Sequence, residues 1–221
     1  MCTVVIASEN EIRVPEEVAD LQSFRRWVYS DDFPEHGKVS FIQGEVWVDM
    51  NAERLQSHAR LKLDFHTVLD RIVKEKDLGM FFPDGALWTN VKANVSNIPD
   101  GMFLAWESLE QGRVAYVGEP EEAVEVEGSP DMVMEVVSRS SVHKDTVSLL
   151  ECYYAAGVRE YWLIDARKKL PVFDILQRGR RGFKSSASVA GWHKSPVFER
   201  EFRLDRGTGR MGLTSYELRV R

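Results

Sequence analysis

A valine-rich apolar run with one acidic residue inside it is the feature that most constrains this fold. The run is MVMEVVS at residues 132–138, and Glu135 is its only charged residue. A continuous apolar run of this length is typical of a strand that is covered on both faces. An isolated ionised carboxylate is costly there, so Glu135 is expected to be paired, neutralised or bound to a cation. The run therefore predicts a buried strand and a site around its carboxylate.

The residues after this strand predict a helix and then a second strand. SRSSVHKDT supplies hydroxyls and an aspartate that can cap a helix, and the helix continues through VSLLECYYAAG to Gly157. Its buried side is expected to hold Val147, Leu149, Leu150 and Tyr154. REYWLIDA then has the composition of another strand. Strand, helix and strand in this order predict a parallel pair with a right-handed crossover, in an α/β or α+β sheet.

The rest of the chain is expected to form further helices and several short strands. After Pro15, EEVADLQSFRRWVYS places its apolar residues on one face of an amphipathic helix. VSFIQGEVWVDM at residues 39–50 has two apolar runs around a Gln-Gly turn, which predicts a hairpin. A long helix is expected over residues 53–76. Short strands are expected between residues 80 and 117.

Length, composition and cysteine usage narrow the class of protein. The chain has 221 residues, of which 43% are hydrophobic, enough for a real core. We expect one domain over 1–221, with a helical lead-in at 1–36, a core at 37–176 and a basic β segment at 177–221. Neither a membrane-spanning run nor a signal-peptide pattern is visible. Cys2 and Cys152 fit no zinc site or disulfide framework, so a cytoplasmic protein without membrane contact is expected.

Charge is distributed unevenly along the chain. Residues 166–221 carry 14 lysines and arginines against 5 acidic residues, whereas residues 1–165 carry 15 against 30. The basic segment QRGRRGFK at 177–184 is a candidate for phosphate contacts, because affinity for nucleic acid comes largely from neutralising its backbone. A solvated hairpin loop is an equally good interpretation of this segment.

A second acidic residue has a setting like that of the central run. NIPDGMFLAW places Asp100 directly after a proline and at the head of an apolar run. A Pro-Asp pair before a strand occurs again at Asp131, upstream of Glu135. Each aspartate can instead end a loop after its proline, and Glu135 can instead form a buried ion pair with Arg139 or Arg159. For Asp131 we expect the structural role.

These motifs together resemble a known family. PDMVMEVVSRSS…KD…Y…AAGVREYWLIDA, with weaker matches in QGEVWVDM and PDGMFLAW, is similar to the Uma family of restriction-endonuclease-like proteins in the PD-(D/E)XK nuclease superfamily. The resemblance covers about residues 41–176. It implies a mixed β-sheet flanked by helices and an endonuclease that hydrolyses DNA phosphodiester bonds with Mg²⁺, or alternatively Mn²⁺. By analogy it also implies a homodimer, because cutting two strands needs two sites.

The resemblance also implies the site residues. By matching positions, Asp100 and Glu135 are the metal ligands, and two carboxylates near one end of a sheet can hold a hard divalent cation. Glu45 and His58 match acidic and histidine positions of the family and are expected to line the same pocket. A turn position for Glu45 and an exposed helix face for His58 are the alternatives.

The sequence departs from the family pattern at the lysine. Val137 stands two residues after the glutamate, and Leu149 stands where the family places a lysine on the following helix. Lys144, near the start of that helix, is the candidate replacement. The departure motivates a second hypothesis, a catalytically degenerate DNA-binding or interaction protein. A metal-dependent hydrolase acting on another phosphodiester is the third.

Overall fold

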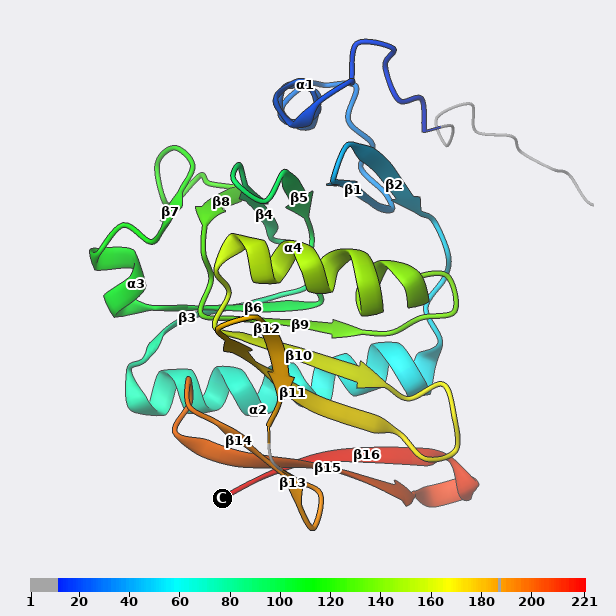
Figure 1. Ribbon diagram of the computed structural model, residues 1–221. Helices are drawn as coiled ribbons and strands as arrows, with labels where there is room; N and C mark the ends of the chain where they lie inside the picture. Colours follow the sequence, from blue (N-terminus) through cyan, green and yellow to red (C-terminus); the bar gives the residue numbers. More distant parts are fainter. Residues whose placement is uncertain (1–11, 187) are drawn as a thin grey trace, which may run out of the picture.

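The computed structural model describes residues 12–186 and 188–221 of the chain, and Figure 1 shows their arrangement. The elements follow one another in this order: α1 (Leu21–Val28), β1 (Lys38–Ile42), β2 (Glu45–Asp49), the π-helical turn η1 (Leu55–Arg60), α2 (Leu61–Lys76), β3 (Gly79–Pro83), β4 (Leu87–Asn90), β5 (Val95–Asn97), β6 (Gly101–Ala105), α3 (Trp106–Glu110), β7 (Val114–Tyr116), β8 (Glu125–Gly128), β9 (Met132–Val136), the π-helical turn η2 (Lys144–Ser148), α4 (Leu149–Ala156), β10 (Glu160–Asp165), β11 (Val172–Gly179), β12 (Gly182–Ser185), β13 (Ser188–Val189), β14 (Trp192–Ser195), β15 (Arg200–Thr208), the 3₁₀ turn η3 (Arg210–Gly212) and β16 (Thr214–Val220).

A mixed six-stranded sheet forms the centre of the molecule. Its strand order is β12-β11-β10-β9-β6-β3, so the valine-rich run becomes the interior strand β9. β9 pairs in parallel with β10 and antiparallel with β6. The predicted strand–helix–strand unit and the predicted mixed β-sheet flanked by helices are therefore confirmed.

Both faces of β9 are covered, as its composition predicts. Met132, Met134 and Val136 join the hydrophobic cluster that contains α2, while Val133 joins the cluster that contains α4. Successive side chains on a strand point to opposite faces. Glu135 therefore lies on the α4 side, at a position where an apolar residue would otherwise be buried.

A second six-stranded sheet, β2-β1-β5-β4-β8-β7, lies beside α4 and carries the predicted hairpin. β1 and β2 pair around Gln43 and Gly44, which both have positive φ, as a tight hairpin turn requires. Val39 and Phe41 pack with α1, so Lys38 and Ser40 face the other way. This alternation places a lysine on the inner side of the hairpin.

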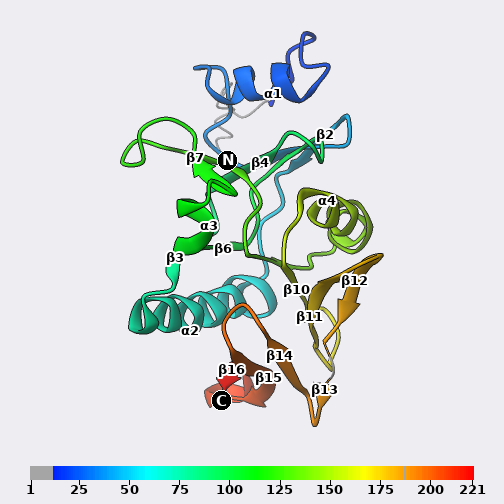
Figure 2. The same cartoon turned by 60° about the vertical axis from the view of Figure 1, so that its left-hand side comes forward.

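The C-terminal strands form a third sheet on the opposite side of the molecule from α1 (Figure 2). Phe198, Phe202 and Leu218 belong to the same hydrophobic cluster as α2. The buried Glu160 carboxylate on β10 accepts hydrogen bonds from Ser195 Oγ at 2.7 Å and Val197 N at 2.9 Å. These contacts favour one domain over 1–221, which stays a prediction.

Several helix predictions need correction. The first helix begins at Leu21, because Asp20 and Ser23 form a reciprocal capping box there. The expected helix over 53–76 is divided into a π-helical turn and α2. The short helix α3 lies in a stretch where only strands were expected.

The buried face of α4 also differs from the prediction. Val147 is exposed, and the residues that the helix buries are Leu149, Cys152, Tyr153 and Ala156. The helix has apolar residues nearly all round, so periodicity alone could not select the face. The selected face is the one whose tyrosine reaches Glu135. Cys152 is a free buried thiol, Cys2 lies outside the described residues, and no helix in the described ranges is long and apolar enough to cross a membrane.

Candidate active site

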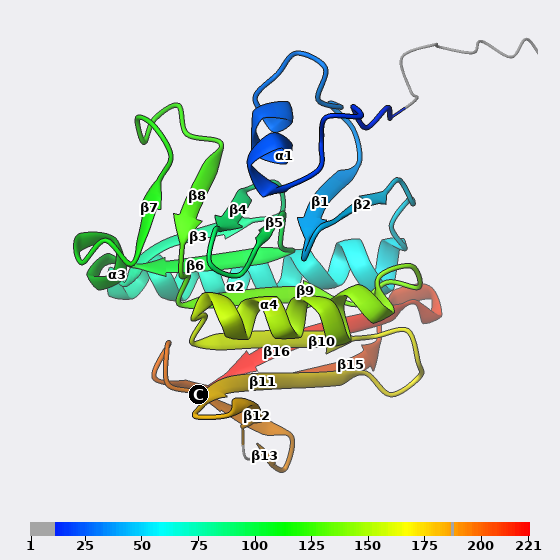
Figure 3. The same ribbon diagram turned by 45° about the horizontal axis from the view of Figure 1, so that its top comes forward.

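A cavity of about 860 Å³ lies where β9 ends. Figure 3 shows the hairpin β1–β2, the start of the helical segment η1–α2 and the start of η2–α4 gathered at this end of the sheet. In the antiparallel pairing of β6 with β9, Gly101 lies opposite Met134. The preceding residue, Asp100, therefore lies beside Glu135, which follows Met134. Both carboxylates line the cavity, as do Lys38, His58 and Lys144.

Glu135 is held by neutral hydrogen-bond donors. It is 2% exposed, and its Oε1 accepts hydrogen bonds from Tyr153 Oη at 2.6 Å and Asn97 Nδ2 at 3.0 Å. Burial raises the pKa of Glu135 to about 8, because attraction to Lys144 only partly offsets the burial and the repulsion from Asp100. Within the described ranges no arginine pairs with Glu135, so the ion-pair alternative does not apply.

Asp100, by contrast, is held by cations. It is 3% exposed, and its Oδ2 accepts a hydrogen bond from Val136 N at 2.8 Å. Its Oδ1 lies 2.6 Å from Lys38 Nζ and 3.5 Å from Lys62 Nζ. Burial raises the pKa of Asp100, but the charges of Lys38 and Lys62 outweigh it and hold the pKa well below its usual range. Two neighbouring carboxylates thus have pKa values shifted in opposite directions.

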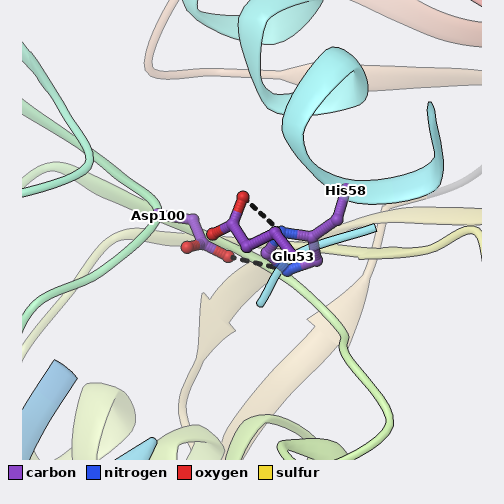
Figure 4. Close-up of side chains that lie close together, drawn as sticks. All are labelled: Glu53, His58 and Asp100. Carbon is purple, nitrogen blue, oxygen red and sulfur yellow. Dashed lines mark ion pairs between the residues drawn. The ribbon is translucent and has the colours of Figure 1, made fainter. Parts of the chain in front are cut away.

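His58 lies in the same cavity with one ring nitrogen fixed and the other without a hydrogen bond. Nε2 lies 2.7 Å from the carbonyl oxygen of Val136, a contact that orients the ring and makes Nε2 the protonated nitrogen. Nδ1 is buried and forms no hydrogen bond, although Glu53 Oε2 is 3.1 Å away. Figure 4 shows the His58 ring joined by dashed lines to the carboxylates of Glu53 and Asp100.

These residues fit a divalent cation. One ligand atom each from Glu53, His58 and Asp100 lies within 4.8 Å of the others. The buried Nδ1 of His58 forms no hydrogen bond, so it can serve as a metal ligand when it carries no proton. Carboxylate oxygens are the ligands that Mg²⁺ and Mn²⁺ prefer, and the imidazole nitrogen favours Mn²⁺ of the two.

The lysine that the motif lacks has two candidate replacements in the cavity. Lys38 Nζ lies between Asp100 and Asp84, at 2.8 Å from Asp84 Oδ1. Burial lowers the pKa of Lys38, but the charges of Asp100 and Asp84 outweigh it and raise the pKa above its usual value. Lys144 Nζ is 3.1 Å from Asp145 Oδ1. Burial lowers the pKa of Lys144, but Glu135 and Asp145 raise it above its usual value. Both ammonium groups are therefore charged.

Three other predicted features lie apart from this cavity. Glu45 is exposed at the start of β2 and does not line the cavity. The basic turn between β11 and β12 lies at the far end of the sheet, because β11 begins at the cavity end and runs away from it. Asp131 accepts hydrogen bonds from Ala105 N, Ser108 Oγ and Arg159 Nη1, and these contacts fit the predicted structural role.

Several site residues were missed by sequence reasoning: Lys38, Glu53, Lys62, Asp84, Asn97 and Tyr153. Lys38 had a visible signal, since it alternates with the apolar Val39 and Phe41 of the predicted hairpin. The sequence around Tyr153 and Asn97 contains no comparable signal, because a tyrosine in an apolar segment and an asparagine in a loop-like segment are common in any chain.

The comparisons with known proteins agree with this geometry. The family model Uma2, described as "Putative restriction endonuclease", matches residues 21–204. Among solved structures the chain is similar to a "putative nuclease belonging to DUF820" from Anabaena variabilis ATCC 29413, with a TM-score of 0.58 and 16% identity over 81% of this chain and 90% of that chain. This likeness shows the fold, and no curated protein matches the chain. The match over residues 21–204 confirms the predicted resemblance, and the chain belongs to the Uma2 family of restriction-endonuclease-like proteins.

Proposed function

We propose that this protein is a metal-dependent endonuclease that hydrolyses DNA phosphodiester bonds. The observation that carries the proposal is the meeting of two buried carboxylates, Asp100 and Glu135, with charged lysines in one cavity. Membership of the Uma2 family supports it. A cytoplasmic location and a homodimer remain proposals, and light scattering on the purified protein tests the second.

Asp100 and Glu135, which line the same cavity, would hold the cation. Glu53 and His58, whose ligand atoms lie within 4.8 Å of one another and of that of Asp100, would be further ligands. A bound divalent cation supplies Lewis-acid stabilisation of the phosphoryl oxygens and a more acidic water. The protein fixes the ligands in advance: Val136 N orients Asp100, while Tyr153 and Asn97 orient Glu135. Lys38 brings a positive charge beside Asp100, where negative charge develops on the phosphate during hydrolysis.

One observation favours the second candidate, a catalytically degenerate DNA-binding protein of the same fold. The ammonium groups of Lys38 and Lys62 already neutralise Asp100. A cation that binds there has to share or displace these partners. Metal binding is therefore the property that separates the two candidates.

Titration calorimetry with Mg²⁺ and Mn²⁺, together with cleavage of plasmid and of circular single-stranded DNA, tests the proposal. Wild-type protein is expected to bind metal and to cut DNA. Asp100→Ala and Glu135→Ala are expected to bind metal at least tenfold more weakly, because each removes a charged ligand. Asp70, a partly exposed aspartate on α2 that pairs with Lys74, supplies the matched control Asp70→Ala, which should behave as wild type. Metal binding without cleavage would favour the degenerate candidate, and cleavage that survives both substitutions would refute the site.

Metal affinity is also expected to rise with pH up to about 8 and to level off above it. The pKa of Glu135 is raised to about 8, so below this pH the carboxyl must lose a proton before it can bind a cation. The expected gain is up to about tenfold per pH unit. Calorimetry with Mg²⁺ between pH 6 and 9 measures it, and a flat profile for the wild type would show that Glu135 does not titrate with binding. Glu135→Gln should lack the dependence.

A further inference from the structure

The depth of the cavity restricts what can reach its carboxylates. Asp100 and Glu135 form its floor and are only 3% and 2% exposed. The volume of about 860 Å³ is within the range of about 300–1,000 Å³ that is typical of pockets enclosing small ligands. Recognition of a DNA duplex instead buries about 1,000–2,500 Å² over a broad protein surface. The cavity therefore fits a short stretch of a flexible strand better than the side of a rigid duplex.

Two arginines on the wall of the cavity have side chains without a partner in the described part of the chain. Arg54 belongs to the segment between β2 and η1, and Arg139 to the segment between β9 and η2, so they come from two different walls. Both are exposed, and neither guanidinium group forms a hydrogen bond or ion pair among residues 12–186 and 188–221. Arg167, which also lines the cavity, is held by Asp165 at 2.7 and 2.9 Å. Unpaired planar guanidinium groups are well suited to bidentate phosphate binding.

An aromatic side chain completes the lining. Trp47 on β2 is half-buried and lines the same cavity, opposite Ser40 on the inner face of the hairpin. A flat ring beside cationic groups is the arrangement with which proteins bind single strands, because every base can stack on it. In a duplex the bases are already stacked on one another and are not free to do so.

We propose that the substrate enters this cavity as single-stranded DNA, with backbone phosphates bound by Arg54 and Arg139 and a base stacked on Trp47. This inference rests on the proposed endonuclease function and names the substrate of the same site. One chain then suffices for cleavage, because only one strand is cut. The basic turn at the far end of the sheet, which contains Arg180, has no part in the contact.

Fluorescence anisotropy in EDTA tests the inference without any cleavage. The probe is a labelled 20-nucleotide strand, free or annealed to its complement, titrated with the full chain at several salt concentrations. The single strand is expected to bind at least tenfold more tightly than the duplex. Arg54→Ala and Arg139→Ala should each weaken single-strand binding several-fold and reduce the salt slope by about one. Arg180→Ala is the matched control and should leave both unchanged.

Duplex binding as tight as single-strand binding, or wild-type affinity in both cavity variants, would overturn the inference. Trp47→Ala separates stacking from charge, since it should weaken binding without changing the salt slope. The two proposals fail differently. Duplex cleavage that needs Asp100 but shows no preference for single strands would leave the endonuclease function standing alone. If the protein binds single strands through Arg54 and Arg139 but cleaves DNA with no metal tested, the binding site stands and the endonuclease function is refuted.

Discussion

Replacing Lys38 with alanine is expected to slow metal-dependent DNA cleavage by about 10²–10³-fold, the loss typical of removing one group that stabilises transition-state charge. The ammonium group of Lys38 lies 2.6 Å from Asp100, inside the cavity and on the hairpin wall. Lys144→Ala is expected to have a smaller effect, because the partner of the Lys144 ammonium group is Asp145, which is not one of the proposed metal ligands. Lys38 would thus take the role of the lysine that positions 137 and 149 lack.

Single-turnover cleavage at saturating metal measures this prediction. Lys38→Arg keeps the charge and should retain more activity than Lys38→Ala, although the guanidinium cannot reproduce the position of a compact ammonium group. Metal affinity is measured on the same variants, because the loss of Lys38 also leaves Asp100 less neutralised and can strengthen metal binding. A wild-type rate in Lys38→Ala, with a large loss in Lys144→Ala, would assign the role to Lys144.

Lys38 illustrates what the sequence could and could not predict about the site. The strand–helix–strand unit around Glu135 is local, so composition and spacing were enough to predict it. Lys38 and Asp100 are separated by 62 positions, and the pairing of β1 with β5 brings the hairpin to the motif strands. The fold was predictable largely because strands and helices are local patterns, whereas the charge balance of the site depends on which segments pack together.

Helix α4 shows the same limit at the level of packing. Its apolar residues surround it, so two faces were equally acceptable to a periodicity argument. The bond from Tyr153 to Glu135 and the burial of Leu149 identify the inner face only after β9 is in place. A leucine at position 149 therefore serves the core, on the face where the family pattern has a lysine.

The two Pro-Asp pairs are expected to give opposite phenotypes. Asp131→Ala should lower the free energy of unfolding by about 2–4 kcal/mol, because each buried donor left without a partner costs about 1–3 kcal/mol. The donors are Ala105 N at 2.8 Å and Ser108 Oγ at 2.9 Å. The partly exposed Arg113 and Arg159 add little, since water can solvate them. Asp100→Ala should instead abolish metal-dependent cleavage with a smaller change in stability. It leaves one buried backbone donor, Val136 N, without a partner, while Lys38 and Lys62 keep Asp84 as a partner.

Urea unfolding and cleavage by the folded fraction separate the two effects. Asp131→Asn is the conservative variant and should recover part of the stability, because its amide oxygen can still accept one of the hydrogen bonds. If Asp131→Ala unfolds at the same urea concentration as the wild type, the network around it contributes nothing. If instead it remains stable and loses activity, Asp131 acts at the site. The same Pro-Asp dipeptide before a strand thus supports packing at Asp131 and chemistry at Asp100. The difference comes from the surroundings of each carboxylate. Neutral donors and arginines surround Asp131, whereas lysines and an open cavity surround Asp100.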